Sequence, residues 1–205
     1  VIGNPDRFLK KEDIFNNSII NKTKKFILNK EQLQALKFLE TKNTGFNVSV
    51  LQGTTGSGKT LVYFERIKKI IKKNYQALVL LPEIFLTNDF KSRFKEYFGF
   101  EPAVWHSKIT PKQKRVIWKG VINNNIKILV GARSALLLPF KKLGIIIVDE
   151  EHDSSYKQDE GVIYNARDMA ISRASFEKIP IHLVTSVPSI ETYNNILNKK
   201  YRHIN

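Results

Sequence analysis

Short, continuously apolar runs alternate along the chain with segments whose apolar residues recur at helical spacing. The strand-like runs cover residues 48–52, 76–81, 102–105, 126–130, 144–148 and 180–184. The helix-like segments begin at residue 29 and then cover residues 61–73, 83–98, 110–122, 166–176 and 188–197. Strands that are apolar throughout are typically buried on both faces, between layers of helices. The pattern therefore predicts an α/β fold, with a mostly parallel sheet and helices on both of its faces.

Polar residues predict where the domain and several of its helices begin. Asn29 precedes an apolar face and is followed by Gln32 in the first helical turn, so it is the expected N-cap of the first helix. Thr110 and Pro111 are the expected N-cap and first residue of a later helix. Residues 1–28 are polar and basic, and we interpret them as a linker or the tail of a preceding module. The predicted domain is 29–205.

The composition favours a polyanionic partner. Lys plus Arg number 34 against 19 for Asp plus Glu, which gives a formal charge of +15. Nucleic acid is the first partner that such an excess suggests, although a lysine-rich, AT-biased genome would give the same composition. The chain has no cysteine, so it carries no disulfide and no thiolate metal site.

Neither a membrane span nor a secretory signal is expected. The sequence has no apolar run of 18 residues, and its first residues, VIGNPDRFLKK, have no apolar core of the kind that a signal peptide requires. We therefore expect a cytoplasmic location. The first residue is not Met, which suggests a fragment.

The segment 53–60, GTTGSGKT, has the complete pattern of a phosphate-binding loop between a strand and a helix. Glycines let such a loop turn tightly and direct several N–H groups at one point, where the positive end of the next helix also favours an anion. Lys59 is expected to reach the β- and γ-phosphates, and the Thr60 hydroxyl to ligate Mg²⁺. The candidate nucleotide-binding residues are Gly53, Thr54, Thr55, Gly56, Ser57, Gly58, Lys59 and Thr60.

A second polar motif, DEEH at 149–152, follows the most continuously apolar strand. Carboxylates at the carboxyl end of a buried strand lie on the ligand edge of an open α/β sheet. Asp149 is the expected Mg²⁺ ligand, and Glu150 is the expected residue that orients and deprotonates the attacking water. Four polar residues after a strand also form solvated turns, and His152 alone fits a hydrogen-bonded linker as well as a relay.

The two motifs together are similar to those of superfamily 2 helicases of the DEAH-like type. Further segments closely resemble the ATPase core of the primosomal protein N′ (PriA) family: LPEIFLT at 81–87, HSK at 106–108, GARSALLLPF at 131–140 and IIIVDEEHDSSYKQDEG at 145–161. The resemblance covers residues 29–195. It implies a RecA-like P-loop NTPase domain, the first lobe of a 3′→5′ DNA helicase that remodels stalled forks in replication restart and helps to reload the replicative helicase.

The resemblance also implies roles for individual residues. ATP and Mg²⁺ are the implied cofactors, with Lys59, Asp149 and Glu150 serving hydrolysis. Gln32 resembles the family's adenine-side residue, although an ordinary helix N-terminus explains it nearly as well.

Three further segments resemble DNA-facing or coupling motifs. Pro82, Glu83 and Thr87 resemble a motif that lies along the DNA strand, and Gly131, Arg133 and Ser134 resemble a second one. His152, Tyr156, Lys157 and Tyr164 belong to a segment that resembles the aromatic-rich loop coupling DNA to the ATP site, in which aromatic side chains can stack on bases. For Arg133 the alternative is a surface arginine, and for the tyrosines it is half-buried packing.

The sequence departs from the family at two motifs. The family's SATPS motif corresponds here to TSVPS at 185–189, where Val187 replaces a hydroxyl residue. Because that motif links hydrolysis to strand movement, the replacement puts coupling in doubt. In the aromatic-rich loop, Ile163 and Asn165 stand where the family tends to carry a basic residue and a His.

The resemblance ends before a second RecA-like lobe, whose arginines would complete the hydrolysis site. The family's zinc-binding cysteines also lie beyond this region, so no zinc is expected in this chain. The expected partners are single-stranded or forked DNA, a second helicase lobe and primosome or replisome proteins, in the cytoplasm at the nucleoid. We expect a nucleotide-binding half-motor with slow turnover.

Two alternative functions stay open. One is a split or decayed helicase that binds nucleotide or DNA without efficient hydrolysis, which Val187 favours. The other is a different P-loop enzyme such as a small-molecule kinase, against which the DEEH motif and the long SSYKQ match argue.

Overall fold

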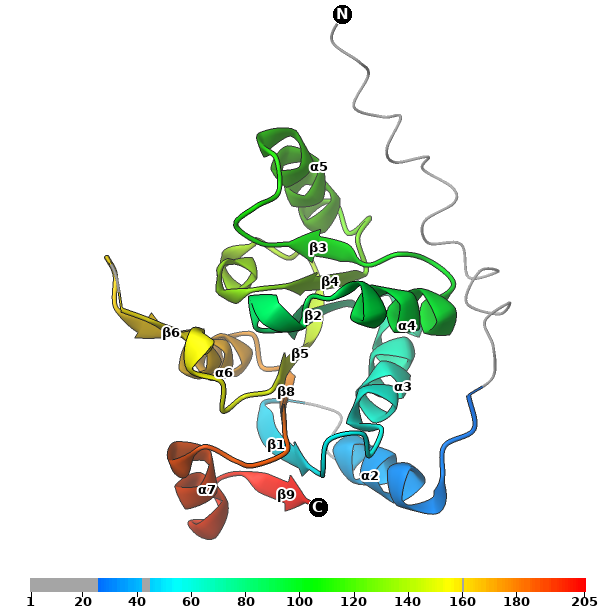
Figure 1. Cartoon of the computed structure of the whole chain (residues 1–205), viewed down its shortest axis with the longest axis vertical. Helices are drawn as coiled ribbons and strands as arrows, with labels where there is room; N and C mark the ends of the chain where they lie inside the picture. The colour runs from blue at the N-terminus through cyan, green and yellow to red at the C-terminus, as the bar shows by residue number, and fades with distance from the viewer. Residues whose placement is uncertain (1–25, 42–44, 160) are drawn as a thin grey trace, which may run out of the picture.

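Seven strands form one sheet in which every neighbouring pair is parallel (Figure 1). The computed structural model describes residues 26–41, 45–159 and 161–205. The strands are β1 (Asn47–Gln52), β2 (Gln76–Leu80), β3 (Ala103–Trp105), β4 (Ile128–Gly131), β5 (Leu143–Asp149), β8 (Pro180–Thr185) and β9 (Arg202–Ile204). Their order across the sheet is β3-β4-β2-β5-β8-β1-β9. The mostly parallel sheet predicted from the apolar runs is confirmed.

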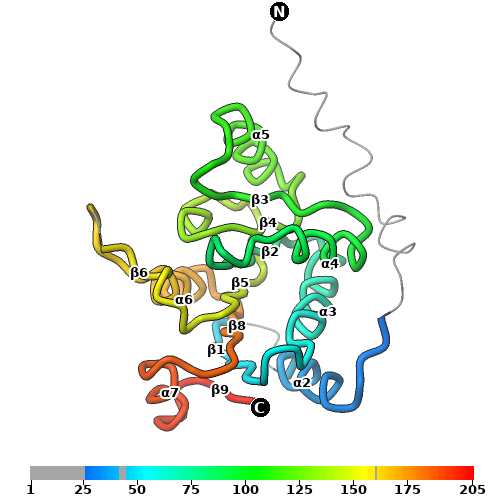
Figure 2. The backbone as a smooth tube through the Cα atoms, viewed as in Figure 1, coloured from blue at the N-terminus to red at the C-terminus, as the bar shows by residue number. Residues whose placement is uncertain are grey.

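Helices connect the strands, and the tube in Figure 2 follows these crossings. The α-helices are α2 (Lys30–Glu40), α3 (Lys59–Lys72), α4 (Asn88–Phe98), α5 (Pro111–Ile122), α6 (Ala166–Phe176) and α7 (Ile190–Leu197). The short 3₁₀ turns are η2 (Glu83–Phe85), η3 (Arg133–Leu137) and η4 (Ser154–Tyr156), and a small antiparallel hairpin pairs β6 (Lys157–Gln158) with β7 (Tyr164–Asn165).

Two helices begin at the N-caps that the sequence predicts. Asn29 and Gln32 form a reciprocal capping box at α2, and Thr110 forms another with Gln113 at α5. The prediction of one helix from residue 83 to 98 is wrong, because η2 ends after one turn. Thr87 then caps a new helix, its side chain accepting a hydrogen bond from Phe90 N at 3.2 Å.

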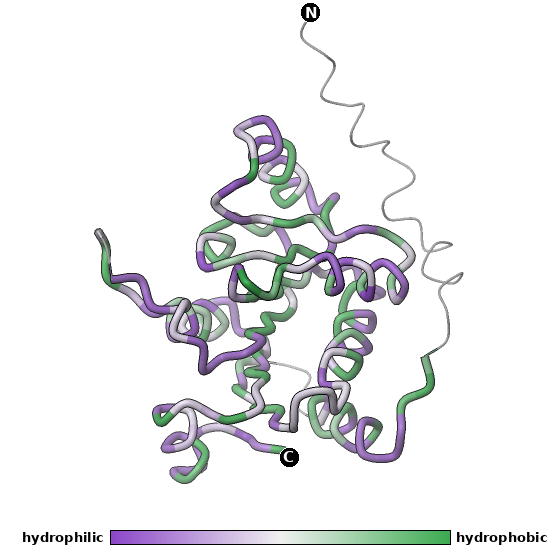
Figure 3. The backbone as a smooth tube through the Cα atoms, viewed as in Figure 1, coloured by the Kyte–Doolittle hydropathy of each residue, from purple (hydrophilic) through white to green (hydrophobic). Residues whose placement is uncertain are grey.

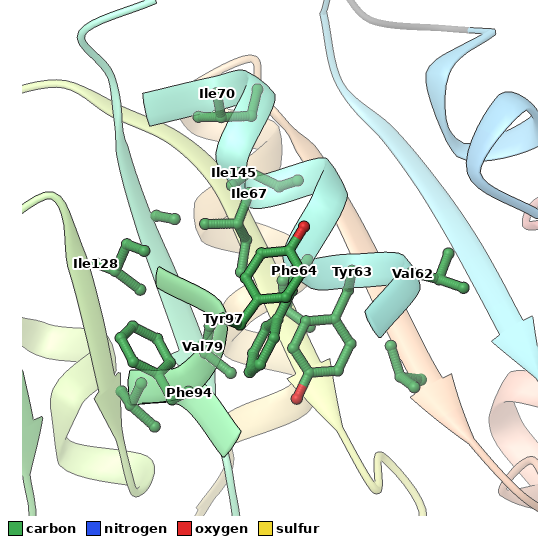
Figure 4. Close-up of a cluster of buried hydrophobic side chains, with 14 of the residues drawn as sticks. Val62, Tyr63, Phe64, Ile67, Ile70, Val79, Phe94, Tyr97, Ile128 and Ile145 are labelled. Atoms are coloured by element: carbon green, nitrogen blue, oxygen red, sulfur yellow. The ribbon is translucent and has the colours of Figure 1, made fainter. Parts of the chain in front are cut away.

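The two faces of the sheet bury separate cores. On one face α2, α3 and α4 pack an aromatic cluster, part of which Figure 4 shows around Phe64, Phe94 and Tyr97. On the other face α5, η3 and α6 pack a mainly aliphatic core. Successive strand residues point alternately to the two cores, and Figure 3 colours the central strands largely as hydrophobic. Helices on both faces are thus confirmed.

The described residues upstream of α2 pack against the domain. Phe26 stacks on Tyr97 with ring centroids 5.3 Å apart, and Leu28 contacts the same core. The rest of the predicted linker, residues 1–25, lies outside the described residues. Among the helices that the structure describes, none has the length and apolar character needed to cross a membrane.

Candidate nucleotide and nucleic-acid sites

The phosphate-loop segment lies between β1 and α3 at the carboxyl edge of the sheet. Gly53 N donates to Thr185 O at 3.1 Å, which ties the loop to the neighbouring strand β8. Gly56 and Gly58 have φ values of 83° and 84°, the left-handed region that favours glycine. Gly58 is the N-cap of α3, so the helix N-terminus opens directly from the loop.

Lys59 lies across this loop. Its Nζ donates to Gly53 O at 2.7 Å and to Thr54 O at 3.0 Å. Two carbonyl oxygens therefore hold the ammonium group beside the N–H groups of the loop. A cation at this point is what recognition of a polyphosphate requires.

Gln32 brings α2 against the same loop. Its Nε2 donates to Ser57 O at 3.0 Å, and its Oε1 accepts from Asn29 N at 3.0 Å. A Cβ at Gly58 would displace the amide end of Gln32 from the loop, and the φ at this position favours glycine. Gln32 thus lies against the phosphate loop and its amide holds that loop, but it is not among the residues that line the adjacent hollow.

Asp149 ends β5 and is only 8% exposed. Its Oδ2 accepts from the Tyr63 hydroxyl at 2.9 Å, and its Oδ1 accepts from Glu150 N at 3.0 Å. Burial raises the pKa of Asp149 to about 6, while the hydrogen bond from Tyr63 acts in the opposite direction. The carboxylate is fixed in position before any ligand binds.

Glu150 has a φ of 51°, which is uncommon for a residue with a side chain. Strained backbone of this kind persists where the surrounding structure imposes it, commonly at functional sites. His152 Nδ1 lies 3.7 Å from Glu150 Oε2 and 2.8 Å from Thr185 Oγ1, so it connects Glu150 to the end of β8.

Tyr63 is a site residue that the sequence analysis did not identify. It lies one turn after Thr60 on α3, where helical periodicity marks it simply as core, and it is fully buried. Burial and the adjacent Asp149 raise the pKa of its hydroxyl well above the ordinary value. A buried tyrosine hydroxyl usually has a hydrogen-bond partner. A tyrosine at an apolar position of the helix was therefore the one signal in the sequence, but it does not identify Asp149 as that partner.

A hollow of about 430 Å³ brings the two predicted motifs together. Its lining residues are Phe26, Thr55, Gly56, Gly58, Lys59, Thr60, Leu61, Phe64, Leu81, Phe85, Thr87, Phe90, Arg93, Glu96, Asp149 and Glu150. Thr60, Asp149 and Glu150 supply hard oxygen ligands there, which fits Mg²⁺ held jointly by protein, phosphate and water. Among the described residues, no cluster of three or more metal-ligating side chains occurs.

A second hollow of about 400 Å³ gathers most of the residues predicted to face DNA. Its lining residues are Leu81, Pro82, Glu83, Ser107, Ala132, Arg133, Ser134, Ser155, Tyr156, Gln158 and Tyr164. Thr87 does not belong to this set: it caps α4 and lines the first hollow. His152 and Lys157 also lie outside the lining.

Hydrogen bonds hold the walls of this second hollow. Arg133 Nη1 donates to Lys157 O at 2.5 Å, which joins η3 to the hairpin. Trp105 Nε1 donates to Ser134 Oγ at 3.2 Å, and the hydroxyl of Ser107 donates to Glu83 Oε1 at 3.0 Å. Arg133 and Ser134 therefore have structural contacts as well as a position beside the hollow.

The prediction that Tyr156 stacks on bases does not fit its position. The side chain is 1% exposed, and its hydroxyl bonds Leu80 O at 2.9 Å and Asp149 O at 2.6 Å. Tyr156 therefore joins the ends of β2 and β5 and leaves no open ring face for a base. Tyr164 is half-buried, and Lys157 is exposed beside Asp159 at 3.0 Å.

Val187, the departure from the family motif, is 66% exposed. Its carbonyl accepts from Thr185 Oγ1 at 2.8 Å, so the residue contributes a backbone group to the turn after β8. The contacts of this turn to the DEEH segment run instead through Thr185 and Ser189.

Known proteins similar to this chain include a helicase family and one group of replication proteins. The profile of the DEAD/DEAH box helicases matches residues 29–195. The chain is 46% identical to replication restart protein PriA of Rickettsia felis over 94% of its own length and 28% of that protein. It is 44% identical to the Haemophilus influenzae PriA over 92% of this chain and 26% of that protein. The chain thus spans about a quarter of the length of these curated relatives.

Solved structures support the fold. RecG bound to a three-way DNA junction has a TM-score of 0.64 with 22% identity, covering 91% of this chain and 24% of that chain. The helicase MrfA bound to DNA and AMPPNP has a TM-score of 0.60 with 19% identity, covering 95% and 29%. At this identity the likeness concerns the fold alone, which is the RecA-like α/β fold of helicases.

Proposed function

This chain belongs to the DEAD/DEAH box helicase family, and from that premise we propose that it is the ATP-binding lobe of a PriA-type replication-restart DNA helicase. One observation carries the proposal: Lys59, Thr60, Asp149 and Glu150 line the same hollow at the carboxyl edge of the sheet. These are the residue types that bind and hydrolyse Mg·ATP, delivered by two motifs about ninety residues apart.

In the proposed mechanism the loop N–H groups and Lys59 hold the β- and γ-phosphates. Thr60 and Asp149 would hold Mg²⁺, whose charge would offset that developing on the phosphates. Glu150 accepts a proton from the water whose oxygen attacks the γ-phosphorus, while the bond from that phosphorus to the β–γ bridging oxygen breaks and ADP leaves. Gln32 is the proposed adenine-side residue.

The second hollow is the proposed path of single-stranded DNA. Arg133, Ser134 and Tyr164 border it, and the hairpin that carries Lys157 lies next to it. Contacts made mostly to phosphates would be independent of sequence and would weaken steeply with salt. The net charge of +15 supports an anionic partner of this kind.

Several finer features rest on similarity to the relatives. They are movement in the 3′→5′ direction, action at stalled forks, primosome partners and a cytoplasmic, nucleoid-associated location. The chain by itself would turn ATP over slowly, because the charge developing on the γ-phosphoryl group needs arginines from a second lobe. In comparable systems such an arginine contributes roughly 10³–10⁵ in rate.

Nucleotide binding tests the proposal directly. A fluorescent ATP analogue with Mg²⁺ should bind the chain, and Lys59→Ala should weaken binding by about 100-fold or more, since the polyphosphate loses its principal cation. Lys72→Ala, at the exposed far end of the same helix, makes the same charge change and should leave affinity within about twofold.

ATP turnover with and without single-stranded DNA separates an active helicase lobe from a fragment that binds nucleotide or DNA without efficient hydrolysis. Slow turnover that DNA accelerates supports the helicase lobe. Binding with no turnover under either condition supports a fragment that binds without hydrolysing. Equal affinity of wild type and Lys59→Ala would overturn the assignment of the phosphate site.

A further inference from the structure

The third residue of the DEEH motif, Glu151, is the centre of a buried ionic cluster. Its side chain is 0% exposed, and that of Arg167 is 6% exposed. Glu151 Oε1 accepts from Ser189 N at 2.8 Å; its Oε2 accepts from Ser189 Oγ at 3.1 Å and from Thr192 Oγ1 at 2.9 Å. Arg167 Nη1 lies 3.3 Å from the same Oε2 and donates to Ser189 Oγ at 2.5 Å.

The cluster joins three separate segments of the chain. Glu151 follows β5, Arg167 lies in the first turn of α6, and Ser189 and Thr192 begin α7. Burying a carboxylate with a guanidinium adds little net stability, because desolvation offsets the attraction between the charges. Such a cluster therefore matters mainly for the geometry that it imposes.

That geometry concerns the loop between the two charges. The segment after Glu151, of which residues 152–159 and 161–165 are described, returns to the domain just before Arg167, so the ion pair closes this loop at its base. Within the loop, the buried Tyr156 is anchored on the ends of β2 and β5. The same pair fastens the loop to the turn that contains Val187, through Ser189.

The cluster also bears on Glu150. Glu151 N donates to Val184 O at 3.2 Å, so both the backbone and the side chain of Glu151 are anchored on β8 and α7. Asp149 is anchored on the other side through Tyr63 and Tyr156. The strained φ of Glu150 is held between these two fixed neighbours.

We propose that Arg167, acting through Glu151, is a positioning residue that makes Glu150, residues 161–165 and the turn 185–189 move as one unit. The Tyr156 hydroxyl ties the middle of the loop directly to Asp149 O, whereas residues 161–165 are linked to the nucleotide site through Arg167, Glu151 and Ser189, without a side chain at position 187. The inference rests on the proposed function, since it concerns how that nucleotide site is linked to its neighbour.

Amide hydrogen exchange measures this link in the chain itself. Saturating Mg·AMPPNP should change exchange over residues 152–165 by about fivefold or more in the wild type, which is a modest coupling. In Arg167→Met the nucleotide should still bind within about threefold of wild type, while the change over residues 161–165, which lead directly into Arg167, should be lost. Retention of the full change in Arg167→Met would overturn the proposal.

Arg173→Met is the matched control. Arg173 lies on the same helix, pairs with Glu177 at 2.8 Å and also donates to Leu138 O at 2.9 Å, so its removal destabilises α6 without touching the cluster. It should preserve the nucleotide-dependent change in the loop. Loss of that change in Arg173→Met as well would attribute the effect to general destabilisation and would overturn the proposal.

Thr192→Val keeps the proposal testable if Arg167→Met fails to fold. It removes one hydroxyl bond to Glu151 while conserving shape, and it should reduce the loop response by about half, whereas an unchanged response overturns the proposal. Wild-type chain that binds nucleotide with no response in the loop overturns this inference and leaves the proposed function standing. Wild-type chain that binds no nucleotide overturns both.

Discussion

The two hollows lie along the same edge of the sheet, share Leu81 in their walls, and are built in different ways. The polar residues of the nucleotide hollow come mainly from two short motifs, and a buried tyrosine holds its central carboxylate. The second hollow draws its walls from four segments that follow β2, β3, β4 and β5. A buried carboxylate thus anchors the first site, whereas the tertiary arrangement of partly exposed loops defines the second.

The difference has an energetic consequence. A buried charged group responds strongly to loss of one partner, because its desolvation is no longer compensated. Exposed groups that contact phosphates each contribute modestly and are screened by salt. Substitutions in the nucleotide hollow should therefore have larger effects on stability and ligand affinity than substitutions in the second hollow, and those effects should depend less on salt.

The largest expected effect is the pH dependence of stability caused by Asp149. Its pKa of about 6 in the fold lies above the ordinary 3.8, so the folded chain binds this proton more tightly than the unfolded chain does. This stabilisation is complete below pH 3.8 and is lost as the pH rises through 6, by about 3 kcal/mol. Denaturant unfolding of wild type and Asp149→Asn at pH 4 and pH 7.5 measures it.

Comparison with Asp149→Asn isolates this group from other buried residues that titrate. Burial lowers the pKa of His182 to about 3, so its neutral form contributes stability that is lost as the pH falls below 6.5. Both proteins share that contribution. A stability difference between them that stays constant from pH 4 to pH 7.5 would contradict the prediction.

Gly58→Ala should have the next largest effect. A side chain there adopts an unfavourable φ and displaces the Gln32 amide from its hydrogen bond to Ser57 O, which together should cost about 2–3 kcal/mol. Gly56→Ala has the same φ with no atom nearby and should cost about 1 kcal/mol less, the size of the lost hydrogen bond. Thermal unfolding and affinity for the ATP analogue both report the difference.

The double variant Gln32→Ala with Gly58→Ala separates contact from backbone strain. Gln32→Ala by itself removes a capping-box bond and a bond to the loop, so it is the reference for the double variant. Relative to Gln32→Ala, the added Gly58→Ala should cost no more than Gly56→Ala does, since the contacting amide is gone. If the added cost stays at about 2–3 kcal/mol, the close approach of α2 to the loop has no energetic role.

Tyr63→Phe should lower the free energy of unfolding by about 2 kcal/mol, the usual size of a hydrogen bond to a charged group. It should also raise the pKa of Asp149 further, because this hydrogen bond lowers it. The midpoint pH of Mg²⁺-dependent nucleotide binding, measured across pH 5–8, should therefore rise. Tyr97→Phe is the control. It removes a hydroxyl from the same aromatic cluster, but that hydroxyl faces Glu65 rather than Asp149, so the midpoint should not shift.

Arg133→Ala should give the smallest effect, and it tests the second hollow. Affinity for a fluorescent oligothymidine should fall about threefold to tenfold, and the salt dependence should lose about one phosphate contact. Affinity for nucleotide should not change. Arg115→Ala on the exposed surface of α5 is the charge-matched control; a loss of DNA affinity equal to that of Arg133→Ala would point to net charge rather than the hollow.

Some features of this protein follow from its sequence alone. The phosphate loop, the DEEH segment and the alternation of strands and helices depend on neighbours within a few residues, through glycine conformations, capping side chains and apolar periodicity. Those local rules fail at residues 83–98, where one predicted helix is a 3₁₀ turn followed by a separate helix capped by Thr87. The same rules still place both motifs at the carboxyl edge of a parallel sheet, because every strand runs in the same direction.

Only the tertiary structure decided which distant groups meet. Periodicity marks Tyr63 and Tyr156 as apolar positions or loop residues, but strand order brings their hydroxyls to Asp149. It likewise pairs Glu151 with Arg167, places Thr87 in the nucleotide hollow, and adds β9 beside β1. The physical reason is that a buried polar group requires a hydrogen-bond partner. The residue type shows that a partner is required, but the packing of the strands decides which group lies close enough to be that partner.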